Sequence, residues 1–357
     1  MLEYGARYGE VRTGSLTGLR RDGVSDARFN GDFDYRERVV ALYTKFDHAV
    51  SEKFQWQAGL RSEWTTVRTR GGDSGRATQD YLNLFPSASL SYLPGDNNQL
   101  SLSYNYRIQR PNYEDLNPFL QYVDPYLITS GNGQLQPAYA HSLELGHLFA
   151  GLLYSSLTYQ VTDGLIDDVL LPGGPDGAAV ERALNLGQRR ELGLGTQAVL
   201  QPREWWQATT ALRAYRATTG LGAEFTGQPA LRIVAGELQT QHTFTLPGGW
   251  RSELSLVYLT PFNDGAYEVR SVTYASAMVG RRVLGDRGRI KLEVNDLFNS
   301  YRIRGALDYP GFRNDFQSVN TFRYAKLSFR LNLSGGKEIE LPDNDKSNQE
   351  QIERLEN

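Results

Sequence analysis

The sequence contains no cysteine and only 2 methionines, and it has no apolar run long enough for a membrane helix, which needs roughly 20 residues. The absence of cysteine excludes disulfides, thiol catalysis and cysteine-ligated metals. The 357 residues carry a net charge of −3, so the chain lacks the basic balance that nucleic-acid binding requires. Its mean hydropathy of −0.48 is that of a soluble protein, but the half-polar strands of a transmembrane barrel average to a similar value.

The first eight residues show no basic region followed by an apolar core, so no signal peptide is visible. This start leaves two possibilities. The protein is cytosolic, or its true N-terminus lies upstream of Met1.

A strict alternation of apolar and polar residues runs through residues 100–110, where Leu100, Leu102, Tyr104, Tyr106 and Ile108 are separated by polar side chains. A period of two is typical of a β-strand with one apolar and one polar face. The pattern recurs along the chain and predicts about fourteen strands, most of them near the roughly 9–11 residues that cross a bilayer at a tilt. They are expected at residues 2–12, 38–47, 54–67, 84–93, 100–110, 141–145, 153–161, 192–200, 206–215, 231–246, 253–259, 272–283, 289–295 and 325–333.

The connections between these strands alternate between short and long. The short turns fall at residues 48–53, 94–97, 149–151, 201–204, 246–249 and 284–288. The long loops fall at residues 13–33, 69–80, 111–140, 162–179, 217–228, 260–267 and 299–320. Antiparallel strands reverse direction each time, so all short turns share one end. This predicts an all-β, antiparallel up-and-down transmembrane β-barrel segment with short periplasmic turns and long extracellular loops.

Two further features complete this picture. Aromatic residues such as Trp56, Trp206 and Trp250 gather beside the short turns, where a membrane interface favours them. The barrel is expected to occupy residues 1–334. Residues 335–357 are rich in acidic side chains and lack aromatics, so they are expected to form a disordered periplasmic tail.

A family resemblance is carried by residues 106–119, which read Tyr-Arg-Ile-Gln-Arg-Pro-Asn-Tyr-Glu-Asp-Leu-Asn-Pro-Phe. This run resembles the Arg-Pro-x-Tyr-x-x-Leu-Asn-Pro-Phe signature of Bacteroidetes-type TonB-dependent outer-membrane receptors. Gly133 takes the place of a proline that is usual in the family. Other elements resemble the family in its own order: Gly-Leu-Arg-Ser-Glu at 59–63, Leu-Phe-Pro-Ser at 84–87, Asp-Pro-Tyr at 124–126, Gly-Asn-Gly at 131–133, Leu-Gln-Pro at 135–137, Asn-Asp-Leu-Phe-Asn at 295–299 and Pro-Gly-Phe at 310–312.

The resemblance implies the C-terminal β-barrel portion of a receptor in the outer membrane of a Gram-negative bacterium. Such receptors close a barrel of about 22 strands around an N-terminal plug domain, which contacts the TonB complex. This chain shows neither the plug nor its TonB contact, so a fragment or a truncated reading frame is expected. The implied partners are outer-membrane lipid, the missing plug, the TonB complex through that plug, and a nutrient ligand.

The function implied by the resemblance is TonB-dependent uptake of a large nutrient such as a siderophore, a vitamin or an oligosaccharide. Two alternatives stay open: a self-contained pore of 14 strands, and a surface-binding or adhesion barrel.

No catalytic constellation is found, so neither an enzyme nor a cofactor is expected. Among the 4 histidines, His141 and His147 share one strand face, but six residues of strand span about 20 Å, too far for one metal ion.

Two sets of polar residues are candidates for binding. Arginine and tyrosine suit an anionic or aromatic ligand through forked hydrogen bonds and stacking. The candidates for substrate contact are Arg107, Gln109, Arg110, Tyr113, Tyr122 and Tyr126. The alternative is that the proline-rich loop after Arg110 uses its residues for its own turns. The residues expected to face the lumen or the plug are Arg61, Glu63, Asn105, Lys291, Glu293, Asn295, Lys326 and Arg330.

Overall fold

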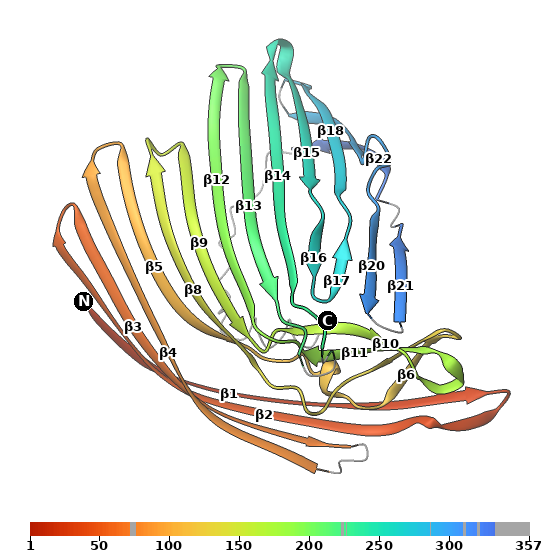
Figure 1. Cartoon of the computed structure of the whole chain (residues 1–357). Helices are drawn as coiled ribbons and strands as arrows, with labels where there is room; N and C mark the ends of the chain where they lie inside the picture. Colours follow the sequence, from red (N-terminus) through yellow and green to blue (C-terminus); the bar gives the residue numbers. More distant parts are fainter. Residues whose placement is uncertain are drawn as a thin grey trace.

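The computed structural model describes residues 1–71, 76–222, 225, 227–285, 287–309, 312–319 and 322–332. Its main feature is one curved antiparallel sheet of 14 strands, each beside its neighbour in sheet order (Figure 1). The strands are β1 (Leu2–Arg21), β2 (Val24–Ser51), β3 (Phe54–Arg70), β4 (Arg76–Gly95), β5 (Asn98–Gln109), β8 (Ala138–Phe149), β9 (Leu153–Asp163), β12 (Arg189–Arg203), β13 (Trp206–Thr219), β14 (Leu231–Leu246), β15 (Trp250–Leu259), β18 (Val272–Val283), β19 (Gly288–Asn295) and β22 (Tyr324–Leu331). The predicted strand number and order are confirmed.

The predicted short turns are confirmed, and so are the long connections after β5, β9, β13, β15 and β19. The loops predicted at residues 13–33 and 69–80 are wrong for most of their length, because β1 and β2 meet at a two-residue turn, β3 runs on to Arg70 and β4 begins at Arg76. Tight turns join β2 to β3, β4 to β5, β8 to β9, β12 to β13, β14 to β15 and β18 to β19, and they follow one rim of the sheet (Figure 1). The longer connections lie at the opposite rim. The predicted tail, residues 335–357, lies outside the described residues, as do Leu333 at the end of the last predicted strand and Pro310 and Gly311 of the Pro-Gly-Phe element.

The two faces of the sheet differ as the alternation predicts. Leu102 of β5 pairs with Leu90 of β4 and Leu145 of β8, and all three point outward with 38%, 40% and 50% of their surface exposed. The next residue, Ser103, pairs with Ser89 and Glu144 on the inner face. An outward apolar surface of this kind suits lipid, and the polar inner surface suits water or a protein partner.

The first long connection is a strand rather than the loop predicted for residues 13–33. β1 and β2 run on as a hairpin to a turn at Asp22 and Gly23, both with positive φ. The inner face of this extension carries Phe29, Phe33 and Tyr35, which are 3%, 4% and 3% exposed. The hairpin is therefore ordered because other parts of the chain cover its inner face.

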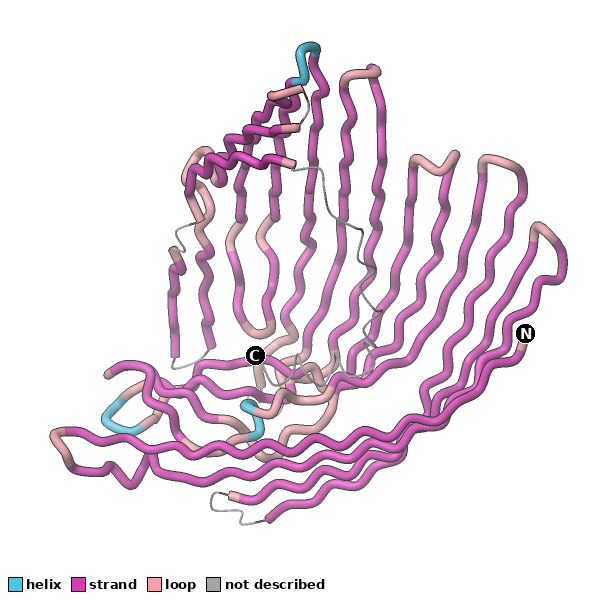
Figure 2. The backbone as a smooth tube through the Cα atoms, turned by 180° about the vertical axis from the view of Figure 1, so that it is seen from behind, coloured by secondary structure: helices cyan, strands magenta, loops and turns pink. Residues whose placement is uncertain are grey.

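The other long connections contain two small sheets that the sequence analysis did not predict. The first has the order β10–β11–β7–β6 and the second β16–β17–β20–β21. Their strands are β6 (Leu120–Asp124), β7 (Leu127–Ser130), β10 (Ile166–Leu171), β11 (Ala179–Asn185), β16 (Phe262–Asp264), β17 (Tyr267–Val269), β20 (Ile303–Tyr309) and β21 (Phe312–Ser318). Both lie on the side of the main sheet opposite the tight turns (Figure 2), and the first extends along the β1–β2 hairpin (Figure 1).

Among the described residues, 3₁₀ turns are found at Glu114–Leu116, Pro175–Gly177 and Pro247–Gly249, and Phe225 also has 3₁₀ conformation. Within the same residues, no helix has the length and apolarity needed to span a bilayer.

The main sheet is open. In the described part of the chain β1 and β22 are the two ends of the strand order and do not pair with each other. Figure 2 shows the sheet curving around a hollow without closing. Each end strand thus presents one row of backbone groups without a neighbour in this sheet.

The facing of β5 predicts the effect of charge on either side of it. Leu102→Arg places a cation on the lipid side and is expected to lower the free energy of unfolding by roughly 2–4 kcal/mol near the bilayer midplane. Ser103→Arg is the matched control on the same strand, where the new side chain meets Glu144 and water, and it should cost much less. Urea unfolding in lipid vesicles measures both, and equal losses for the two variants would contradict the facing.

Candidate ligand-binding site

The segment that follows β5 is here called the signature loop, residues 110–137. It begins with Arg110, whose side chain turns back onto the inner face of β2 and β3 and is only 6% exposed. Its guanidinium lies 2.6 Å from Glu63 Oε2 and 3.7 Å from Glu37 Oε1, and it donates to Thr65 Oγ1 at 3.1 Å. Both carboxylates are themselves buried, so the ion pairs form part of the wall.

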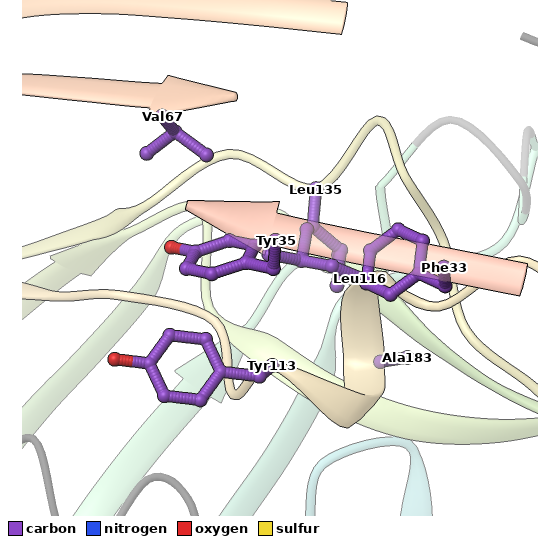
Figure 3. Packing of buried hydrophobic residues seen from close by; sticks show 7 residues of the cluster. All are labelled: Phe33, Tyr35, Val67, Tyr113, Leu116, Leu135 and Ala183. Atoms are coloured by element: carbon purple, nitrogen blue, oxygen red, sulfur yellow. The ribbon is translucent and has the colours of Figure 1, made fainter. Parts of the chain in front are cut away.

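The next turn of the signature loop packs against the same wall. Tyr113 is 4% exposed, and its ring lies 4.5 Å from that of Tyr35, between centroids. The hydroxyl of Tyr35 donates to Glu37 Oε2 at 2.5 Å, which connects the aromatic pair to the ion cluster. Figure 3 shows Tyr113 beneath Tyr35, with Leu116 and Leu135 of the loop beside Tyr35 in the same cluster. The loop therefore has a hydrophobic core in common with the barrel wall.

Two further parts of the signature loop, around Asn117 and around Gly131, are hydrogen-bonded to each other. The N–H of Gly131 donates to the carbonyl of Asn117 at 2.8 Å, and a Cβ at Gly131 would lie 2.4 Å from that same oxygen. Only glycine fits this close approach. Phe119 covers Gly31 of β2, where a Cβ would fall 2.1 Å from the ring. The loop is thus fastened both to itself and to the extended hairpin.

The six candidates for substrate contact do not form one cluster. Arg110 and Tyr113 are buried in the packing just described. Arg107 and Gln109 are exposed on the inner face of β5, in register with Ala140 and Ala138. Tyr122 is 40% exposed on β6, with its ring against Phe29, and Tyr126 is 82% exposed at the turn before β7.

The eight residues expected to face the lumen or the plug all project from the inner face of their strands. Several are engaged within the wall: Lys291 lies 2.7 Å from Glu293, and Glu293 also accepts a hydrogen bond from Tyr324 at 3.1 Å. Asn295 accepts from Ser276 at 2.5 Å and donates to the carbonyl of Phe322 at 2.9 Å. Arg61 pairs with Glu63. Their contact with a plug stays a prediction.

An acidic cavity of about 380 Å³ lies beside the signature loop and was not predicted. Its lining includes four carboxylates and no cationic side chain; it comprises Asn112, Glu114, Asp115, Gln121, Thr129, Ser130, Gly131, Asp168, Glu181 and Ala183. In the described part of the chain no group of three or more histidine or acidic side chains is arranged to hold a metal ion. The four carboxylates therefore give the cavity a negative lining.

Burial sets the protonation of this region. It raises the pKa of Asp115 to about 6, and the nearby charge of Asp168 adds to the rise. Asp167 lies next to Asp168 on β10, in the β10–β11 hairpin. Burial raises the pKa of Asp167 to about 7, and the nearby charge of Asp264 adds to the rise. Asp167 lies against Gly265 in the turn between β16 and β17, where a Cβ would meet the carboxylate at 1.8 Å. The signal was present in the sequence as two aspartates inside the apolar stretch at residues 165–171.

Comparison with known proteins identifies the class. Residues 1–331 match the outer membrane protein beta-barrel family. The chain therefore belongs to that family, whose place is the outer membrane of Gram-negative bacteria. Among curated protein sequences none matches the chain.

The solved structures that resemble it are barrels of TonB-dependent receptors. The ferric-catecholate import receptor Fiu from E. coli K12 is 13% identical, with a TM-score of 0.65 and coverage of 92% of this chain and 51% of that one. The ferric yersiniabactin uptake receptor FyuA from Yersinia pestis is 12% identical, with a TM-score of 0.65 and coverage of 92% and 51%. The siderophore receptor PiuA from Acinetobacter baumannii is 14% identical, with a TM-score of 0.63 and coverage of 92% and 52%.

These likenesses are of fold, and they confirm the resemblance found in the sequence. The chain spans about half the length of the three receptors. The family and these neighbours are outer-membrane barrels and transport receptors, not enzymes.

The ion cluster predicts a large effect at Arg110. Arg110→Met removes the buried cation that faces Glu37 and Glu63, leaves Arg61 as the cation beside Glu63, and should cost about 3–5 kcal/mol of unfolding free energy. Arg107→Met, three residues earlier and exposed, is the control and should change it by less than about 0.5 kcal/mol. Urea unfolding in vesicles, with protease cleavage of the signature loop as a local probe, measures both. If Arg110→Met is as stable as the control, the cluster does not hold the loop.

The raised pKa of Asp167 predicts that the β10–β11 hairpin loses stability as pH rises. An acid whose folded pKa lies above its unfolded value of about 4 stabilises the fold fully below pH 4, and this contribution is lost as pH rises to about 7. Hydrogen exchange of residues 166–171, corrected for intrinsic rates, should show falling protection over this window. Asp167→Asn should flatten the profile, whereas Asp96→Asn in a short turn should leave it unchanged. A profile that stays steep in Asp167→Asn would assign the titration to another group.

Proposed function

We propose that this chain forms the wall of an outer-membrane receptor for TonB-dependent uptake of a large nutrient, such as a siderophore, a vitamin or an oligosaccharide. The observation that carries the proposal is the open sheet of 14 strands with a polar inner face, whose fold is that of TonB-dependent receptor barrels of about twice the chain's length. In this proposal a plug domain fills the hollow and makes the contact with the TonB complex.

The open edges support a role within a larger barrel. Backbone groups in lipid need internal partners, because water is not there to bind them. A closed pore made of these strands alone would need β1 to pair with β22, and the described strands do not make that pairing. Additional strands between the two edges would satisfy both rows of backbone groups and widen the barrel enough for a plug.

The division among the candidate residues suggests their roles. Arg107 and Gln109 are exposed on the inner face, so they are available to a ligand or to the plug. Tyr122 and Tyr126 present rings at the extracellular end, where a ligand would first arrive. Arg110 and Tyr113 act by holding the signature loop in place. The eight lumen residues would form the water-bridged or direct contacts of the plug.

Uptake in the native host tests the proposal. A strain that lacks the gene is compared with strains that carry the full gene or its Arg107→Ala/Gln109→Ala double variant. The probes are a ⁵⁵Fe-loaded catecholate, a ⁵⁵Fe-loaded phenolate, labelled cobalamin and a labelled oligosaccharide. We expect one probe to accumulate only with the full gene and only in cells without a protonophore. The double variant should reduce that uptake at least fivefold, because two polar contacts are lost.

Ser103→Ala, on the same face and nearer the short-turn rim, is the matched control and should transport normally. Energy-independent passage of all small solutes would instead indicate a pore. Cell-surface binding of these probes without accumulation would indicate a binding or adhesion barrel.

A further inference from the structure

The outer face of β1–β4 changes character abruptly along the strands. One row, formed by Tyr8, Val40, Trp64 and Leu82 in register, is apolar and 64%, 47%, 58% and 68% exposed. The next three rows on this face follow at intervals of two residues toward the long connections. They are almost free of apolar side chains. They are Glu10, Arg38, Thr66 and Asp80; then Arg12, Arg36, Arg68 and Thr78; then Gly14, Asp34, Arg70 and Arg76.

These rows contain six arginines, here called the arginine patch: Arg12, Arg36, Arg38, Arg68, Arg70 and Arg76. Three carboxylates in the same rows, Glu10, Asp34 and Asp80, leave an excess of positive charge. Glu10 alone takes up three of the arginines, since it lies 2.7 Å from Arg12, 2.8 Å from Arg36 and 3.4 Å from Arg38.

The remaining three arginines are available to an external partner. Arg68, Arg70 and Arg76 are exposed and form no ion pair with any carboxylate that the structure describes. Together with Arg12 and Arg36 they line a surface cavity of about 550 Å³. Gly14 and one carboxylate, that of Asp34, also line this cavity. The cavity is thus an outward-facing site with a surplus of guanidinium groups.

The height of the patch decides which partner it meets. Four residues of strand separate Trp64 from Arg68, which is about 13 Å along the strand and about 10 Å along the membrane normal after a tilt of roughly 40°. The headgroup layer of one leaflet is about 5–8 Å thick. With the Trp64 row at the edge of the hydrocarbon core, the Arg38 row, two residues further along, lies about 5 Å from that edge and within the headgroup layer. The backbone of Arg68 lies just beyond this layer, and long arginine side chains of this kind bring their guanidinium groups back toward it.

We propose that the arginine patch binds the phosphate groups of a phosphorylated glycolipid of the outer leaflet, while the acyl chains of that lipid lie against the Trp64 row. A guanidinium matches phosphate through two parallel hydrogen bonds, and three unpaired guanidiniums beside one cavity complement more than one phosphate oxygen. A molecule with both a phosphate and apolar chains fits the charged rows and the apolar row at once.

The test uses the full chain purified from outer membranes in a mild, uncharged detergent. Native mass spectrometry measures binding of three probes: diphosphorylated lipid A, the same lipid after enzymatic dephosphorylation, and inorganic phosphate. We expect the phosphorylated lipid to bind, the dephosphorylated lipid to bind at least tenfold more weakly, and inorganic phosphate not to compete at micromolar concentration.

The variant Arg68→Gln/Arg70→Gln/Arg76→Gln should weaken binding of the phosphorylated lipid at least tenfold. The control Arg203→Gln/Arg287→Gln/Arg289→Gln makes the same change in charge at the short-turn rim and should leave it unchanged. If the first triple variant does not fold, Arg70→Gln alone should weaken binding about threefold, and added salt should weaken binding to the unaltered chain. Equal binding of both lipids, competition by inorganic phosphate, or equal losses in the two triple variants would overturn the proposal.

Discussion

The structure depends on one constraint: backbone N–H and C=O groups in lipid must be paired within the protein. In the described part of the chain, fourteen antiparallel strands satisfy much of this requirement for one another, and β1 and β22 each have one side without a neighbouring strand in this sheet. Once the backbone is arranged in this way, the two faces of each strand meet different surroundings. Leucines such as Leu102 and Leu292 face lipid, while Ser103 and Glu293 face the hollow.

Beyond the membrane the same constraint no longer applies, and side-chain packing takes over. The inner face of the β1–β2 hairpin becomes apolar at Phe33 and Tyr35, and the signature loop covers it. The buried Arg110 brings a charge into this packing, which is tolerated because Glu37 and Glu63 are held on adjacent strands to receive it. Such a pair adds little stability over an apolar replacement, but each partner depends on the other. The cluster therefore acts mainly by fixing where the loop docks.

The strands of the main sheet could be predicted because alternation is a local property of sequence. The two small sheets could not, since their strands run for only 3 to 7 residues and β11 pairs in parallel with β7 across more than 50 residues of chain. The position of the Arg110 side chain could not be predicted either. Continued alternation would point it toward lipid, but Pro111 follows the end of β5, and the chain turns so that Arg110 meets a carboxylate 47 positions earlier. That meeting is a property of the folded wall.

This result separates what the signature motif specifies from what it leaves open. Arg110, Tyr113, Asn117 and Gly131 are all engaged in holding the loop to itself or to the wall. A group already paired and buried gains little by binding a ligand, because it would first have to give up its present partners. The motif therefore determines the fold of the extracellular end, and ligand choice falls to side chains that the loop presents, such as Tyr122 and Tyr126, and to those left open on the inner face, such as Arg107. A resemblance built on this motif consequently predicts architecture better than it predicts substrate.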